Sequence, residues 1–254
     1  MTRDMRELSM PELRDVVAEQ PYELLFVTVS GAHLYGFPSV DSDVDLRGVH
    51  VLPLSDVVGL RGGPETIDRM WTRAGAEIDL VTHDAGKFFR LLLRRNGYVL
   101  EQLLSPLVVT TGPVHAELVD LAPSLLTRHH AHHYRGFGRG QWRLFQQGND
   151  LKPLLYTFRV LLTGIHLLRS GEVVAHLPTL VDLVDAPAYL PDLIATKAGA
   201  EHSTVDGDFE ADIAGLFQVL DDTEQDSELP DSPTAEPALH DLLVRLRTRG
   251  LTFL

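Results

Sequence analysis

Residues 30–51 read SGAHLYGFPSVDSDVDLRGVHV and decide the fold, because a glycine turn is followed there by two aspartates one residue apart. Side chains alternate between the two faces of a strand, so Asp43 and Asp45 share one face while Val44 and Leu46 point into the core. Two carboxylates this close raise each other's pKa unless a cation neutralises them, and a site of oxygen ligands favours Mg²⁺. The stretch therefore predicts metal-assisted phosphoryl or nucleotidyl transfer beside a phosphate-binding turn.

A third carboxylate is expected from a later strand, since two metal ions need more ligands than one pair of aspartates offers. The sequence Glu77-Ile78-Asp79-Leu80 alternates charged and apolar residues inside a strand predicted over 76–82. Asp79 is the expected third ligand, with Glu77 on the same face as the alternative. We expect Asp79 to bind the catalytic metal and to orient or deprotonate the attacking hydroxyl.

The pattern of a glycine and a small residue, a spacer, and Asp-hydrophobic-Asp-hydrophobic resembles the DNA polymerase β-like nucleotidyltransferase superfamily. It stands here as Gly31-Ala32 followed by residues 43–46. Within that superfamily, the GAHLYG, DSDVDLRGV and GYVLEQLLSP segments look most like the RNA-repair-pathway polymerase β-like group. The matched segments cover roughly residues 22–105, with a weaker match at 152–172.

This resemblance implies an α/β (α+β) fold, in which a small mixed β-sheet nucleotidyltransferase domain is followed by a helical C-terminal domain. It also implies an enzyme that moves a nucleoside monophosphate from an NTP such as ATP to an acceptor hydroxyl and releases pyrophosphate. The expected cofactor is two Mg²⁺ ions, held by Asp43, Asp45 and Asp79, with Mn²⁺ as a substitute. An RNA end is the acceptor that the group implies, and a protein or small-molecule hydroxyl stays open.

The order of the predicted elements divides the chain in the same way. Strands are expected over 22–29, 43–51 and 76–82. After Pro123 the remaining segments read almost entirely as helices. We therefore place a nucleotidyltransferase α/β domain at 1–122 and a helical domain at 123–254, with an acidic loop near 221–237.

Composition is that of a globular protein, with 44% hydrophobic and 23% charged residues in 254. The absence of cysteine excludes disulfides and thiolate metal sites. The N-terminus carries no apolar signal core, and no apolar run approaches the length of a membrane span, so we expect a cytoplasmic protein without membrane partners. The net charge of −14 argues against non-specific nucleic-acid binding by the whole surface.

The glycine turn and a later helix supply the expected phosphate contacts. Gly31 permits close backbone approach to a phosphate, while Ala32 stands where the family usually has a serine that contacts the triphosphate. Lys152, Tyr156 and Arg159 share one face of a predicted helix, and Lys152 is the preferred phosphate ligand; a solvated basic face is the alternative. The nucleotide-binding candidates are Ser30, Gly31, Ala32, His33, Ser42, Lys152, Tyr156 and Arg159.

Four residues around the aspartates have two readings each. His33 and Tyr35 either contact phosphate or substrate, or pack under the loop. Ser42 is in position to orient Asp43 by a hydrogen bond. Arg47 is an ion-pair partner of the aspartates or a phosphate ligand, and an ordinary polar surface residue is the alternative for it and for Ser42.

Residues 128–143, RHHAHHYRGFGRGQWR, mix basic and aromatic side chains. Such a stretch favours a basic wall that faces phosphate, tracks a nucleic-acid backbone and stacks a base. Its four histidines are ligands for transition metals by type, but their spacing matches no closed zinc pattern, so we favour the basic wall. These histidines are His129, His130, His132 and His133.

Two other hypotheses remain open. A non-catalytic nucleotide- or RNA-binding module of the same fold is favoured by Ala32, and it predicts nucleotide binding without turnover. An interaction protein would dock a basic partner through residues 201–236, which hold twelve acidic residues and no Lys or Arg. No oligomeric state is predicted.

Overall fold

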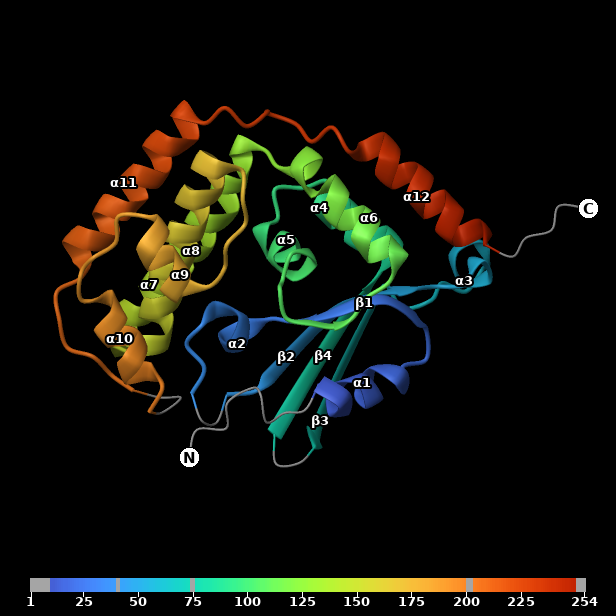
Figure 1. Cartoon of the computed structure of the whole chain (residues 1–254), viewed down its shortest axis with the longest axis horizontal. Helices are drawn as coiled ribbons and strands as arrows, with labels where there is room; N and C mark the ends of the chain where they lie inside the picture. The colour runs from blue at the N-terminus through green and yellow to red at the C-terminus, as the bar shows by residue number, and fades with distance from the viewer. Residues whose placement is uncertain (1–9, 40–41, 74–75, 200–202, 250–254) are drawn as a thin grey trace, which may run out of the picture.

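The computed structural model of the chain describes residues 10–39, 42–73, 76–199 and 203–249 (Figure 1). Its N-terminal part is a five-stranded sheet in the order β3-β4-β2-β1-β5. The strands are β1 (Glu23–Val29), β2 (Val44–Val51), β3 (Thr66–Arg73), β4 (Ala76–Asp84) and β5 (Val108–Thr110). Strands β2 and β4 are parallel and the other neighbours are antiparallel, so the predicted mixed sheet is confirmed.

Helices flank the sheet and make up most of the second half of the chain. They are α1 (Met10–Ala18), α2 (Gly31–Tyr35), α3 (Leu54–Val58), α4 (Ala85–Leu92), α5 (Gly97–Leu103), α6 (Pro113–Leu121), α7 (Ala131–Gly148), α8 (Leu151–Ser170), α9 (Leu177–Leu183), α10 (Leu190–Lys197), α11 (Glu210–Asp226) and α12 (Glu236–Thr248). Helix α1 lies on one side of the sheet and α4, α5 and α6 on the other, with α7 to α11 gathered beside them (Figure 1). Helix α12 returns to pack on α4.

The side of the sheet under α1 is closed by a small apolar cluster. Val44 and Leu46 of β2 are fully buried in it, together with Ile78 and Leu80 of β4. Because strand side chains alternate, burying these residues turns the intervening polar residues of both strands to the opposite side. The alternation predicted from the sequence is therefore confirmed, and it fixes the face on which the acidic residues lie.

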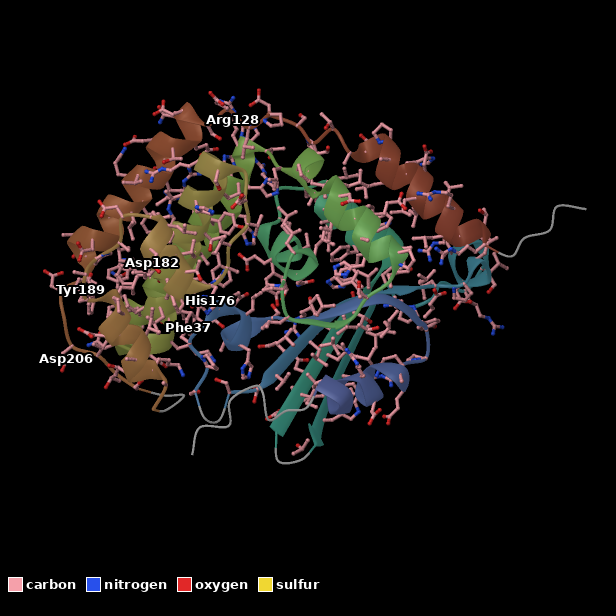
Figure 2. All side chains as sticks on the ribbon, in the orientation of Figure 1. Phe37, Arg128, His176, Asp182, Tyr189 and Asp206 are labelled. Carbon is pink, nitrogen blue, oxygen red and sulfur yellow. The ribbon has the colours of Figure 1, made fainter. Side chains whose placement is uncertain are left out.

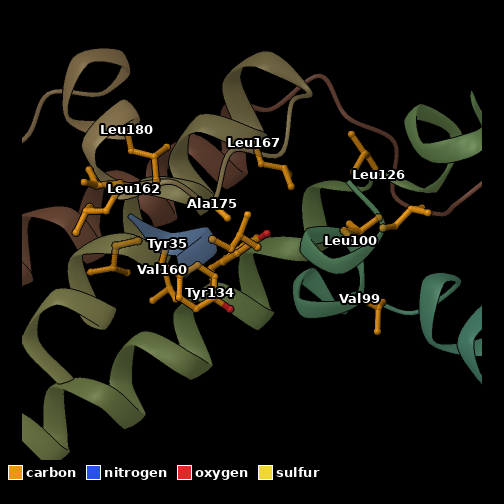
Figure 3. Packing of buried hydrophobic residues seen from close by; sticks show 14 of the residues in the cluster. Tyr35, Val99, Leu100, Leu126, Tyr134, Val160, Leu162, Leu167, Ala175 and Leu180 are labelled. Atoms are coloured by element: carbon orange, nitrogen blue, oxygen red, sulfur yellow. The ribbon is translucent and has the colours of Figure 1, made fainter. Parts of the chain in front are cut away.

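A larger apolar cluster fills the opposite side and continues into the helical part. Figure 3 shows Tyr35, Leu100, Tyr134 and Val160 together in it, although they come from α2, α5, α7 and α8. Burial of this extent is the main favourable term holding the helical part to the sheet. One core thus serves both parts, and the division of the chain at 122–123 stays a prediction.

Three elements differ from the expectation drawn from the sequence. Strand β3 over 66–73 is not predicted, because most of its side chains are exposed and give no apolar period. The turn at Gly31 is the first residue of α2. The acidic loop predicted at 221–237 is helical as far as Asp226, where Arg135 of α7 pairs with acidic side chains on the last turns of α11.

Helix α8 corrects the expectation that no apolar run reaches the length of a membrane span. It has 20 residues and is the one helix, among the residues that the structure describes, that is long and apolar enough to span a membrane. However, 83% of its most apolar window is buried inside the protein. Its apolar surface is therefore that of a central core helix.

A buried ion pair joins α8 to α5. The Arg159 Nη1 atom donates to Glu101 Oε1 at 3.0 Å, and the two side chains are only 3% and 1% exposed. The guanidinium carbon of Arg159 also lies 3.7 Å from the centre of the Tyr35 ring, a cation–π contact. The desolvated guanidinium of Arg159 thus connects helix α8 to α5 and α2.

Removing one partner of this ion pair tests how much the pair contributes to the free energy of unfolding. We expect Glu101→Gln to lower the free energy of unfolding by about 3–5 kcal/mol, because it leaves the Arg159 charge buried and uncompensated. Urea unfolding measures the change. The matched control is Glu65→Gln, which breaks the Arg90–Glu65 pair with side chains 58% and 57% exposed and costs at most about 1 kcal/mol. Equal losses in both variants would contradict this account.

Candidate active site

Two strands bring the acidic residues together. In the parallel pairing of β2 with β4, Asp45 lies directly opposite Asp79. Both side chains are half-buried and point away from the α1 side of the sheet, because Val44 and Leu46 fill that side. The predicted convergence of carboxylates from two strands is thus confirmed for Asp45 and Asp79, while their role as metal ligands stays a prediction. Glu77, the alternative to Asp79, is exposed.

Arg47 lies between these two carboxylates. Its Nη2 atom donates to Asp45 Oδ1 at 2.7 Å and to Asp79 Oδ2 at 2.9 Å. Its Nη1 atom donates to the backbone carbonyl of Asp79 at 3.0 Å, and its Nε atom donates to the Tyr98 hydroxyl at 3.1 Å. Arg47 is therefore an ion-pair partner of the acidic residues, one of the two roles expected for it. A cation already bridges the two carboxylates.

Gly31 turns the chain and also leaves room for the Asp45 carboxylate. Gly31 has φ +63°, in the left-handed region, and a Cβ atom placed on it would lie 1.8 Å from Asp45 Oδ2. The backbone N–H of Ser30 donates to the Asp45 carbonyl at 2.8 Å. Only glycine fits the conformation and the space together, so Gly31 fixes the position of the Asp45 carboxylate.

The other predicted residues of the turn surround this pair at different depths. Asp43 is exposed and directly precedes β2. Ser30 and Ala32 are buried, and Ser42 Oγ accepts a hydrogen bond from the backbone N–H of Ser39 at 2.9 Å. The His33 ring is half-buried against the backbone of Ser42 and Asp43, and burial lowers its pKa although both aspartates oppose the shift. His33 is therefore neutral at pH 7.

A pocket of about 640 Å³ opens over Asp45. Aromatic side chains from α2, α5, α7 and α8 form much of its wall, and Arg95 brings a positive charge to it. The lining residues are Gly31, Tyr35, Asp45, Arg95, Asn96, Tyr98, His133, Phe137 and Tyr156. Burial, with Arg159 and His130 nearby, lowers the pKa of His133 to about 4, so this wall carries a neutral imidazole at pH 7.

The three nucleotide ligands predicted on helix α8 lie in different surroundings. Tyr156 lines the pocket, as a substrate-facing residue should. Lys152 is half-buried near the start of α8 and is not among the lining residues. The prediction of Arg159 as a nucleotide ligand is wrong. Its side chain is buried beneath Tyr35 and paired with Glu101, because the helix face that it shares with Tyr156 turns into the core one turn later. It supports the pocket wall rather than a nucleotide.

Five lining residues were not singled out as nucleotide ligands from the sequence. Arg95, Asn96 and Tyr98 form the link into α5 and its first turn, and His133 and Phe137 lie one turn apart on α7. Tyr98 belongs to the GYVLEQLLSP segment, so the family pattern pointed to the region without naming the residue. His133 and Phe137 belong to the 128–143 stretch, for which the sequence predicted a wall that faces phosphate. Arg95 and Asn96 have no signal in the sequence, since their position at the pocket depends on how α7 packs beside α5.

The charge on Asp45 is only partly compensated. Burial raises its pKa most; Arg47 opposes the shift, whereas Asp79 and Asp43 add to it, and the net pKa is above the ordinary value. Loss of solvent is thus the largest cause of the raised pKa, and the neighbouring carboxylates add to it. A divalent cation supplied from solution would complete the balance.

This chain is similar to known proteins along most of its length. The model of the RNA repair pathway DNA polymerase beta family matches residues 5–245. An uncharacterized protein of Methanocaldococcus jannaschii is 29% identical over 222 residues, which cover 83% of this chain and 88% of that protein. A solved structure, the nucleotidyltransferase-like protein from Exiguobacterium sibiricum, aligns over 87% of this chain and 75% of its own with 12% identity and a TM-score of 0.35.

The fit of Gly31 against Asp45 predicts a large cost for any side chain at this position. We expect Gly31→Ala to lower the free energy of unfolding by about 1–3 kcal/mol, because alanine is strained at positive φ and its methyl displaces the carboxylate. Urea unfolding measures it. The control is Gly62→Ala, where a Cβ meets no atom within 4 Å and the change stays within about 0.5 kcal/mol. A Gly31→Ala protein as stable as the control would refute the assigned contact.

The raised pKa of Asp45 predicts a pH-dependent stability difference. Its protonated form stabilises the fold below the ordinary pKa of 3.8, and that contribution is lost as the pH rises. In metal-free buffer, Asp45→Asn should therefore melt at a higher temperature than the wild type at pH 7, and the difference should shrink as the pH falls. Thermal unfolding across this range measures it, with exposed Asp68→Asn as the control. A lower melting temperature for Asp45→Asn at pH 7 would contradict the assignment.

Proposed function

This chain belongs to the RNA repair pathway DNA polymerase beta family, and on that premise we propose that it transfers a nucleoside monophosphate from an NTP to an acceptor hydroxyl. The observation that supports the proposal most is the position of Asp45 opposite Asp79 across parallel strands. Asp45 also lines a pocket of about 640 Å³, a volume in the range of small-molecule sites.

The donor set suits Mg²⁺, with Mn²⁺ as a substitute. All three acidic residues offer carboxylate oxygens, which are hard ligands. Arg47 donates hydrogen bonds to Asp45 Oδ1 and to Asp79 Oδ2, that is, to one oxygen of each carboxylate. Asp43, Asp45 and Asp79 are the residues that would hold the ions. When bound, the ions supply neutralisation of the triphosphate and a lower pKa for the acceptor hydroxyl.

In the proposed reaction, the acceptor oxygen forms a bond to the α-phosphorus while the bond from that phosphorus to the β-phosphate oxygen breaks. Pyrophosphate leaves with the electron pair of the broken bond. Asp79, the inner of the two strand carboxylates, accepts the hydroxyl proton or passes it to water. Asp45, held by Gly31 and Arg47, fixes the geometry, so the chain acts by positioning and by neutralising charge.

The pocket wall suits a nucleoside next to phosphates. Tyr98, Phe137 and Tyr156 offer aromatic faces and edges on which a base can stack, and the buried Tyr35 ring supports them from below. Arg95 is exposed at the rim and provides a donor for phosphate oxygens. We propose an RNA end as the acceptor, since the family is described by its RNA repair pathway.

Transfer of label tests the proposal. The protein is incubated with each of the four NTPs labelled at the α-phosphate, with Mg²⁺ and with RNA carrying a free terminal hydroxyl. We expect label on the RNA, and a loss of rate of about 100- to 1000-fold in Asp45→Asn and in Asp79→Asn. Asp68→Asn, an exposed acid on β3, is the matched control and keeps the wild-type rate.

Nucleotide binding is measured alongside by equilibrium dialysis, so that binding and chemistry are separated. If NTP binds but no RNA, protein or small-molecule acceptor takes up label, the chain is a nucleotide-binding module without transferase activity. Unchanged transfer in Asp45→Asn would instead remove the carboxylates from the mechanism.

A further inference from the structure

We propose that His129, His132 and Glu224 form a second metal site, for a transition-metal ion of the Zn²⁺ class. Among the residues that the structure describes, they are the one group of three whose ligand atoms all lie within 4.8 Å of one another. The site uses none of the carboxylates at the sheet, so it stands or falls independently of the proposed transferase activity.

Two of the three separations between the ligand atoms are close to those around a zinc ion, and the third is within 4.8 Å. His132 Nε2 lies 3.3 Å from Glu224 Oε1, and His129 Nδ1 lies 3.6 Å from the same oxygen. Ligands about 2.0–2.1 Å from a tetrahedral zinc ion are separated by about 3.3–3.4 Å. An ion therefore fits between these atoms with small side-chain movements, and water would complete four-coordination.

The site joins two distant parts of the chain. His129 lies in a short 3₁₀ helix (Arg128–His130) and His132 follows in the first turn of α7, so the two rings share one side. Glu224 comes from the last turns of α11. Figure 2 labels Arg128 beside the segment that leaves α11, and its backbone N–H donates to the Pro230 carbonyl at 3.1 Å.

One ligand atom has no other use in the fold. His129 Nδ1 is buried and makes no hydrogen bond, although buried ring nitrogens normally find a partner. The atom faces Glu224 Oε1 across the proposed ion position. A cation between this buried ring nitrogen and the carboxylate would give both atoms a partner.

Neighbouring charges hold the ligands from outside. Arg135 pairs with Glu224 Oε2 and donates to Asp221 Oδ1 at 2.6 Å, which leaves Glu224 Oε1 for the ion. Asp231 Oδ1 lies 3.6 Å from His129 Nε2 and 3.0 Å from Arg128 Nε. Such contacts behind the ligands orient them and are the usual surroundings of a protein metal site.

Arg95 opposes metal binding. Its Nη1 atom lies 2.7 Å from His132 Nδ1, and since arginine only donates, the neutral ring carries its proton on Nε2. An ion on Nε2 requires that proton to move to Nδ1 and Arg95 to leave. The Arg95 side chain is exposed and also lines the pocket over Asp45, so it can turn away from His132 toward that pocket. Metal binding and the Arg95–His132 hydrogen bond therefore exclude each other.

A cobalt titration tests the site in the full chain. Metal-free protein receives Co²⁺ in excess Mg²⁺, which occupies oxygen-only sites, and the visible absorption of tetrahedral Co²⁺ is followed. We expect one ion per chain, displaced by Zn²⁺, and a loss of affinity of about 100-fold in His132→Gln and in Glu224→Gln. His240→Gln, an exposed histidine on α12, is the control and binds as the wild type does.

Arg95→Ala provides the second variant, because it removes no ligand and leaves the fold around Glu224 intact. The Arg95→Ala protein should bind Co²⁺ more tightly than the wild type. In the wild type, Zn²⁺ at about 100 times its Kd should raise the melting temperature by roughly 5–10 °C. No tetrahedral signal in the wild type, or equal affinity in His132→Gln and the control, would show that these side chains form salt bridges only and would overturn the proposal.

Discussion

The structure depends on one electrostatic constraint: two carboxylates lie side by side across parallel strands β2 and β4, and a cation has to lie with them. In the structure that cation is the Arg47 guanidinium, which contacts both Asp45 and Asp79. The glycine conformation at position 31 and the Tyr98 hydroxyl are both arranged around this pair. The pocket opens over Asp45, whose carboxylate is desolvated and lies beside two other carboxylates, so a divalent ion and the phosphates that it neutralises fit the proposed chemistry.

Much of the sheet could be predicted because its central strands have strong patterns. β1 and β2 are rich in buried β-branched residues, and the alternation around Asp45 and Asp79 assigns each side chain to a face. Strand β3 was missed since an exposed edge strand needs no apolar period, and only its hydrogen bonds to β4 define it. The helical extension of α11 was missed because its acidic residues look like a loop until Arg135 pairs with them.

The site could be predicted only where its residues lie close together in the sequence. Position along a helix assigned Arg159 to the face of Tyr156, but whether that face meets solvent or Glu101 depends on a helix nearly sixty residues earlier. The same limit hid the proposed metal site, since the histidines around 129–132 match no zinc spacing by themselves. Their missing ligand, Glu224, arrives through the packing of α11 on α7. Local sequence patterns therefore do not predict contacts that depend on the packing of distant helices.

Anomalous X-ray scattering from crystals grown with Mn²⁺ and a non-hydrolysable NTP would locate the divalent ion relative to the two strand carboxylates. We expect an anomalous peak about 2–2.5 Å from a carboxylate oxygen of both Asp45 and Asp79, with the triphosphate in the pocket over Asp45. Carboxylates that still hold only Arg47, with manganese bound elsewhere or to the nucleotide alone, would contradict it.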